Sequence, residues 1–268
     1  MIRLKTDQEI EQIAVASRLA SETLEYLKER AKPGVSTIHL DALAEEYIRA
    51  RGAVPSPKGY RGYPNSICTA VNHVVVHGIP NETPLADGDL ITIDVTVYIN
   101  GFHGDKATAI IVGGDGSAEV RRILAATEHA MYRGIACAIP GGNLGDIGAS
   151  IQDYAESRGY SVVRDFCGHG IGRDFHEEPQ VLHFGEPGSG RRLRPGMVFT
   201  VEPMVNQGRY DVRVLEDGWT VITKDGMLSA QFEHTVAVTD NGPRVLTLYT
   251  PHEHEMWSRF DPARTENE

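Results

Sequence analysis

The chain has 268 residues, of which 41% are hydrophobic and 24% charged, so fibrous and disordered classes are excluded. Its net charge of −11 disfavours nucleic acid as a partner, and its three widely spaced cysteines form no disulfide framework. A polar N-terminus and the absence of a long apolar run lead us to expect a cytoplasmic enzyme that binds neither DNA nor a membrane.

Two amphipathic helices are predicted near the N-terminus. Thr6 and Glu9 form a capping box ahead of the first helix, which Pro33-Gly34 stops. The second helix begins at Ser36 or Thr37 and ends at Gly52. Both carry apolar residues at helical spacing, so each is expected to bury one face.

Strand and helix signals alternate in the rest of the chain. A Pro, Gly and Tyr-rich loop at 54–64 precedes strand-like runs at 66–76 and 90–98, and Asn100-Gly101 predicts a hairpin to a strand near 104–112. Helices are expected at about 117–138 and 144–158, followed by strands as far as residue 248.

An internal repeat relates the two halves of the chain. Pro33-Gly34 matches Pro140-Gly141 at an offset of 107, and this match continues to Gly52 and Gly159. The segment 88–97 matches 196–205 at an offset of 108 and aligns Asp94 with Glu202. Two such offsets predict two α/β halves related by pseudo-symmetry, each supplying an acid from the same place. Generic similarity between helix–strand units is the alternative.

The predicted hairpin brings two aspartates together. With a two-residue Asn100-Gly101 turn, paired positions sum to 201, so Asp105 lies opposite Thr96. Thr96 and Asp94 share a face of their strand, which makes the two aspartates diagonal neighbours about 7–8 Å apart. Such a pair is either a solvated polar face or the beginning of a metal site.

Further candidate ligands come from the second half. His169 and His176 lie in a Gly-rich stretch at 168–179 that matches neither a HExxH motif nor a phosphate-binding loop. Glu202 and Glu233 lie in apolar strand-like runs, where a buried acid needs a partner. Each residue alone is ambiguous. Four carboxylates and one imidazole together suit two adjacent divalent ions of the Mn, Fe(II) or Co type.

These motifs resemble those of the type I methionine aminopeptidases. The resemblance covers roughly residues 4–248 and is carried by motifs in the order that the family shows. They are Cys68–Asn72, Val76–Pro80, Ile93–Val97, Gly101–Asp105, Gly168–Pro179, Glu202–Met204, Asp217–Thr220 and Gln231–His234.

The resemblance implies an α+β pita-bread fold, with a central antiparallel sheet and helices on its outer face. It implies one catalytic metallopeptidase domain at 1–250. The remaining residues, 251–268, are polar and are expected to form a mobile C-terminal tail. The implied activity is removal of the initiator methionine from nascent polypeptides whose second residue is small. A monomer that docks on the ribosome near the exit tunnel is also implied.

The family pattern also implies residue roles. Asp94 would chelate one ion, Asp105 and Glu233 would bridge two, and His169 and Glu202 would hold the other. The ions would be Co, Mn, Fe(II) or Zn. Glu202, His77 and His176 would be catalytic, with both histidines contacting the substrate. The implied methionine pocket contains Tyr60, Tyr63, Cys68, Phe175 and Trp219, and a Na or K site would use Asn72, Val74 and Ser229.

Three other interpretations compete with this one. A proline-directed aminopeptidase or dipeptidase shares the fold and metals but carries an added N-terminal domain, so its metal motifs begin later in the chain. A non-catalytic pita-bread peptide-binding protein would have lost metal ligands. A type II enzyme would carry a helical insertion for which we find no spare segment. The sequence therefore favours the type I enzyme.

Overall fold

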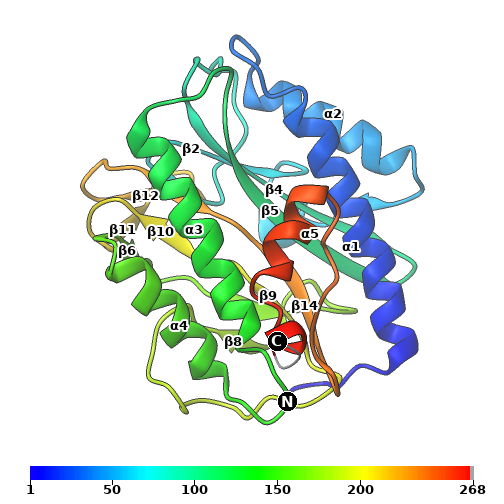
Figure 1. Ribbon diagram of the computed structural model, residues 1–268. Helices are drawn as coiled ribbons and strands as arrows, with labels where there is room; N and C mark the ends of the chain where they lie inside the picture. The colour runs from blue at the N-terminus through cyan, green and yellow to red at the C-terminus, as the bar shows by residue number, and fades with distance from the viewer. Residues whose placement is uncertain (266–268) are drawn as a thin grey trace.

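The computed structural model describes residues 1–265 and consists of helices packed over antiparallel sheets (Figure 1). Two helices lie in each half of the chain and two short ones follow near the C-terminus. They are α1 (Asp7–Lys28), α2 (Thr37–Arg49), α3 (Ala118–Ala136), α4 (Leu144–Glu156), α5 (Pro251–Ser258) and α6 (Pro262–Thr265), with a 3-10 turn η1 (Tyr60–Gly62).

The strands form four sheets in which every pair is antiparallel. The first contains β1 (Val54–Pro55), β2 (Cys68–Val71), β4 (Leu90–Ile99) and β5 (Phe102–Ile111). The largest contains β7 (Gly168–Gly170), β8 (Glu177–Val181), β9 (Val198–Val201), β14 (His234–Thr239) and β15 (Gly242–Val245). Two smaller sheets contain β6 (Ser161–Val162), β10 (Met204–Asn206) and β13 (Ser229–Gln231), and β3 (Val74–Val76), β11 (Val212–Val214) and β12 (Val221–Thr223).

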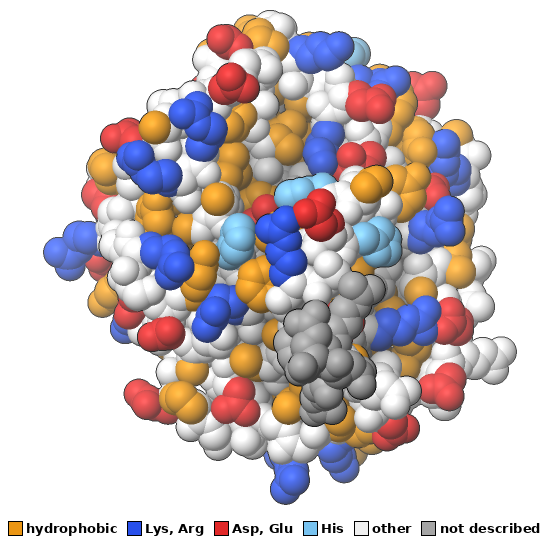
Figure 2. Space-filling view, in the orientation of Figure 1, with side chains coloured by type: hydrophobic (Ala, Val, Ile, Leu, Met, Phe, Trp, Pro, Cys, Tyr) orange, Lys and Arg blue, Asp and Glu red, His pale blue; other side chains and the backbone are white. Residues whose placement is uncertain are grey.

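The helices cover one face of these sheets, as predicted. Helix α1 begins at the predicted capping box, in which Thr6 and Glu9 each accept a backbone N–H of the other, an arrangement worth roughly 0.5–2 kcal/mol. Its apolar stripe is buried against β4 and β5. Figure 2 shows acidic and basic side chains intermixed over this helical face. In the described part of the chain, no helix is long and apolar enough to cross a membrane.

The internal repeat is visible in the hydrogen bonds. Gly34 N donates to Leu85 O, and Gly141 N donates to Leu193 O in the other half. Helices α2 and α4 begin and end at residues that are 107 apart. The guanidinium of Arg51 stacks on the Tyr47 ring at 3.3 Å, and its counterpart at residue 158 does the same on residue 154 at 3.5 Å. The predicted pseudo-symmetry is therefore confirmed.

The hairpin also has the predicted register. Asn100 and Gly101 both have positive φ values, 54° and 85°, as the tight turn requires. Strands β4 and β5 pair without a bulge, and Thr96 is opposite Asp105. The Thr96 hydroxyl donates to Asp105 Oδ1 at 2.6 Å. The turn has thus fixed which residues of the hairpin can meet.

The structure differs from the sequence prediction at three places. The run at 66–76 is split into β2 and β3, because Asn72 adopts a left-handed conformation with φ 55°. The run at 197–205 is split at Glu202-Pro203, since proline cannot donate to a ladder. The expectation of a polar tail at 251–268 is wrong for residues 251–258. They form α5, which has its own capping box and buries Trp257. Residues 266–268 lie outside the described residues.

Candidate active site and metal centre

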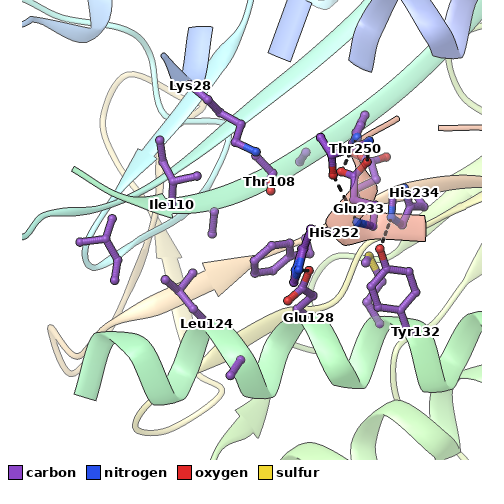
Figure 3. A pocket seen from close by; sticks show the side chains of 18 of the residues that line it. Lys28, Thr108, Ile110, Leu124, Glu128, Tyr132, Glu233, His234, Thr250 and His252 are labelled. Carbon is purple, nitrogen blue, oxygen red and sulfur yellow. Dashed lines mark hydrogen bonds and ion pairs between the residues drawn. The ribbon is translucent and has the colours of Figure 1, made fainter. Parts of the chain in front are cut away.

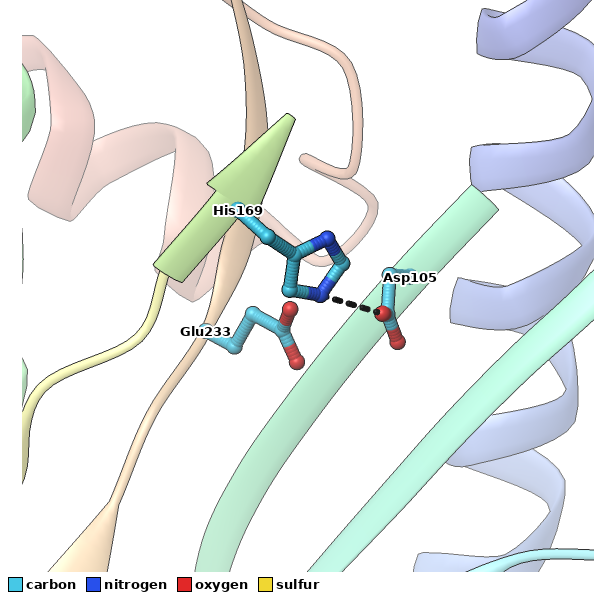
Figure 4. Close-up of side chains that lie close together, drawn as sticks. All are labelled: Asp105, His169 and Glu233. Atoms are coloured by element: carbon cyan, nitrogen blue, oxygen red, sulfur yellow. Dashed lines mark ion pairs between the residues drawn. The ribbon is translucent and has the colours of Figure 1, made fainter. Parts of the chain in front are cut away.

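The five predicted metal ligands line one cavity. Asp94 and Asp105 come from β4 and β5, His169 from β7, and Glu202 and Glu233 from the breaks between β9 and β10 and between β13 and β14. Ligand atoms of Asp105, His169 and Glu233 lie within 4.8 Å of one another, and their side chains converge on one point (Figure 4). His169 Nε2 is 3.7 Å from both Asp105 Oδ2 and Glu202 Oε1. Asp94 lines the same cavity outside the group of three.

The hydrogen bonds orient His169 as a ligand. Its Nδ1 is 3.0 Å from Gly170 O, so the Nδ1–H is donated to this carbonyl. The Nε2 lone pair is then directed at Asp105 and Glu202. Metal-binding histidines usually have their second nitrogen engaged in this way. Burial lowers the pKa of His169 to about 4, which keeps the imidazole neutral and able to bind a cation.

Glu202 is held by three neighbours. The Thr200 hydroxyl donates to Oε1 at 2.6 Å, and Gln231 Nε2 donates to Oε2 at 3.3 Å. The backbone N–H of Glu202 donates to His183 Nε2 at 3.1 Å. Because strand β9 ends at residue 201, the carboxylate lies between two sheets and faces the cavity instead of pairing within one.

Without a bound cation, the ionised form of the four carboxyl groups is strongly disfavoured. Burial raises the pKa of Asp94 to about 7 and that of Glu202 to about 8. Burial and the neighbouring carboxylates hold the pKa values of Asp105 and Glu233 well above their usual range. At neutral pH such a cluster must retain protons or bind cations. The oxygen-rich donor set with one imidazole therefore fits divalent metal ions.

An aromatic slot continues the cavity away from these ligands. The cavity has a volume of about 420 Å³ and is lined by all five residues of the expected methionine pocket. The rings of Tyr60 and Phe175 are 5.0 Å apart, and Tyr63 meets Trp219 edge-on at 5.1 Å. The Tyr63 hydroxyl is within 3.1 Å of two backbone carbonyls, so this residue also fastens its loop. Cys68 completes the wall beside Asp94, its partner in the β2–β4 register.

His77 and His176 lie on the same cavity, between the ligands and the slot. The His176 ring is 4.1 Å from the His169 ring and stacks on Tyr60 at 5.1 Å. His77 has a left-handed backbone with φ 57° and meets Phe166 edge-on. Burial lowers its pKa to about 4, so it is neutral at pH 7 and offers both a donor and an acceptor.

The three residues of the expected monovalent-cation site are also close together. Ser229 N donates to Asn72 O at 2.9 Å, and Val74 begins the neighbouring strand β3. The Ser229 hydroxyl is buried and has no hydrogen-bond partner among residues 1–265. An oxygen-binding cation would satisfy this hydroxyl. The three residues do not line the cavity that contains the other candidates.

Several residues that hold the site in place were not predicted from the sequence. Lys5 forms a buried ion pair with Glu177, the residue after His176, and so ties the N-terminal segment to the Gly-rich stretch. Thr200 and His183, which hold Glu202, were not singled out either. Thr200 carried a signal, because the repeat aligns it with Thr92. His183 and Lys5 lie outside the motifs that carry the resemblance, so only the fold brings them to the site.

Comparisons with known proteins show which family and which solved structure this chain matches. Residues 11–240 match the model of metallopeptidase family M24. The chain is 49% identical to methionine aminopeptidase A of Synechocystis sp. over 92% of this chain and 98% of that one. It is 51% identical to a methionine aminopeptidase of Escherichia coli K12, covering 92% and 94%. The crystal structure of a methionine aminopeptidase from Rickettsia prowazekii superposes with a TM-score of 0.91 at 48% identity, covering 92% of this chain and all of the other.

Proposed function

The chain belongs to metallopeptidase family M24 and is a metal-dependent aminopeptidase that removes N-terminal methionine from nascent polypeptides, and we propose how its residues do so. The observation that supports the proposal is a single cavity with ligand-type side chains at one end and an aromatic slot at the other. A peptide whose N-terminal methionine side chain occupied the slot would have its scissile amide beside the metal-ligand end of the cavity.

The metal centre is proposed to hold two divalent ions, drawn from Co, Mn, Fe(II) and Zn. Asp94 would hold one ion, His169 and Glu202 would hold the other, and Asp105 and Glu233 would be shared by both. The proposal of a metal centre is supported by Asp105, His169 and Glu233, whose ligand atoms lie within 4.8 Å of one another. When bound, such an ion pair lowers the pKa of a water molecule and polarises a carbonyl.

The protein side chains then handle the proton and the substrate. Glu202 accepts the proton of the attacking water and delivers it to the leaving amine, as a general base and then a general acid. Its fixed partners, Thr200 and Gln231, hold the carboxylate in place for both transfers. His176 donates a hydrogen bond to the scissile carbonyl, and His77 contacts the amide nitrogen. The aromatic rings around them keep bulk water from the reacting bond.

Metal removal should make the stability of the protein strongly pH-dependent. In the metal-free protein the four carboxyl groups have raised pKa values, so their stabilising contribution is complete below the ordinary carboxyl pKa and is lost as pH rises through 7 to 8. We expect the metal-free Tm to be lower at pH 8 than at pH 5.5. Two equivalents of Mn²⁺ should restore it with release of protons, measurable by calorimetry in two buffers.

The Asp94→Asn variant is the control for this pH effect. It removes one of the crowded charges, so its metal-free Tm should vary less with pH. Saturation at one ion, or a metal-free Tm independent of pH in the unaltered protein, would contradict the two-ion centre.

Selection of methionine is proposed to depend on the aromatic slot. A thioether gains about 0.3–1.5 kcal/mol against an aromatic edge, and a narrow slot excludes branched chains. We expect Met-Ala-Ser to be cleaved about 10–200-fold more efficiently than Leu-Ala-Ser. Met-Lys peptides should also be poor substrates, because His77 crowds the second residue. Measurement of kcat/KM on these peptides tests the proposal, and equal values for the first two would refute it.

The remaining expectations are proposals of the same kind. Asn72, Val74 and Ser229 bind one Na or K ion, with the unpartnered Ser229 hydroxyl as support. The enzyme works as a cytoplasmic monomer close to the ribosome exit, with residues 1–250 and the packed helix α5 as its catalytic domain. A proline-directed enzyme of the same fold is the other candidate, and cleavage of Met-Pro or Xaa-Pro peptides in preference to Met-Ala-Ser would favour it.

A further inference from the structure

A polar network lies behind the proposed metal ligands, on the opposite face of their strands. Lys106 follows Asp105, and His234 follows Glu233, so strand alternation directs these basic side chains away from the metal cavity. Lys106 is only 1% exposed. Its ammonium is 2.6 Å from Glu253 Oε1 on helix α5 and 3.0 Å from Thr247 O.

Thr247 joins this network to the rest of the fold. Its carbonyl accepts from Ser21 of α1 as well as from Lys106. Its hydroxyl oxygen accepts the Thr235 N–H at 3.1 Å and is 2.7 Å from His234 Nδ1. The segment just before α5 is thus bonded to both strands that carry the bridging carboxylates.

The same strands are fastened to each other at the ligands themselves. The Thr235 hydroxyl donates to Asp105 O at 2.8 Å, and Glu233 N donates to Ala107 O at 2.9 Å. These hydrogen bonds link the backbone of Asp105 to Thr235, which also bonds Thr247, and the backbone of Glu233 to the residue after Lys106. Figure 1 shows α5 lying between α1 and α3, in front of these strands.

A second cavity, of about 510 Å³, borders the pair between α3, β5 and α5 (Figure 3). Lys28, Leu124 and Tyr132 are among the side chains that line it. Beside this cavity the buried ion pair links the first turn of α5 to β5. A buried ion pair is also a poor means of gaining stability, since apolar side chains of similar size usually do as well. Its presence points to a positional role.

We propose that Lys106 and Glu253 are positioning residues of the metal centre: their ion pair clamps α5 onto β5 and so holds Asp105 and Glu233 at the separation at which they share two cations. This inference rests on the proposed metal site. It extends the metal-binding apparatus to helix α5, beyond the residues 11–240 that match the family model.

Metal affinity of the folded protein is the decisive measurement. Metal-free samples of the unaltered protein, Lys106→Met and Glu253→Gln would be titrated with Co²⁺, followed by calorimetry and visible absorbance. We expect both substitutions to weaken Co²⁺ binding by about 10–100-fold, as loss of an outer partner of metal ligands does. A purely electrostatic role predicts opposite signs, because removing a nearby cation strengthens binding and removing an anion weakens it.

Two further variants separate positioning from stability. Ile151→Ala removes a buried side chain of α4 that is not part of the network, and it should lower Tm without changing Co²⁺ affinity. The double variant Lys106→Met/Glu253→Gln leaves no unpaired buried charge, so it should fold and still bind Co²⁺ more weakly. Unchanged affinity in the double variant, or changes of opposite sign in the single variants, would overturn the inference. Absence of Co²⁺ binding by the unaltered protein would instead refute the proposed metal centre.

Discussion

Replacing Glu202 with Gln should reduce kcat by about 10²- to 10⁴-fold, the usual contribution of a general base. The substitution preserves the size of the side chain and removes its ability to take a proton. Because Glu202 is also a proposed metal ligand, we expect part of the decrease in kcat to come from loss of bound metal. The measurement is therefore kcat for peptide cleavage at saturating Mn²⁺, with the metal content of each sample determined in parallel.

Glu178→Gln provides the matched control for this prediction. Glu178 is an exposed glutamate on β8 that does not line the cavity, so the same chemical change there should leave kcat unaltered. A Glu202→Gln enzyme that is fully loaded with metal and has near-normal kcat would show that another group carries the proton.

Alanine at His176 or His77 should lower kcat while metal content stays normal. Each imidazole faces the space between the ligands and the aromatic slot. The loss of one donor to a carbonyl that gains negative charge costs about 10²–10³-fold. We expect the larger effect at His176, whose proposed partner is the oxygen where charge develops. Steady-state kinetics and metal analysis of the two variants check this expectation.

His254→Ala is the corresponding control, since His254 is exposed on α5. It should change neither kcat nor metal content. If a folded His176→Ala protein instead lost its metal, His176 would be a ligand, and the 4.1 Å approach of its ring to His169 would reflect shared coordination.

The parts of the fold that were predictable depend on local rules. Asn100 and Gly101 specify a tight turn, and that turn alone determines that Asp105 is opposite Thr96. The repeat was readable because glycines with positive φ recur at matching positions, such as Gly34 and Gly141. The turn is sufficient to bring Asp94 and Asp105 together, and the repeat is sufficient to align Asp94 with Glu202.

The parts that could not be predicted depend on contacts between distant segments. Pro203 signalled an interruption, but nothing local indicated that β9 and β10 would join different sheets and leave Glu202 between them. The helix at 251–258 carried a local signal that was not used, because Thr250 and Glu253 have the capping-box spacing and Pro251 occupies the first helical position. Its first turn is anchored by Glu253, whose partner Lys106 is 147 residues away.

Two buried lysines each pair with a carboxylate that is synthesised much later, so these ion pairs form in a definite order during synthesis. Lys5 pairs with Glu177, 172 residues later, and Lys106 pairs with Glu253, 147 residues later. At 5–20 residues per second, Lys106 waits roughly 7–30 s for its carboxylate. Until Glu253 emerges, the hairpin that carries Asp94 and Asp105 contains a lysine whose positive charge lacks its partner carboxylate and cannot be buried in an apolar core. The hydrolytic centre of a newly made molecule therefore matures only after Glu253 has been synthesised and has paired with Lys106.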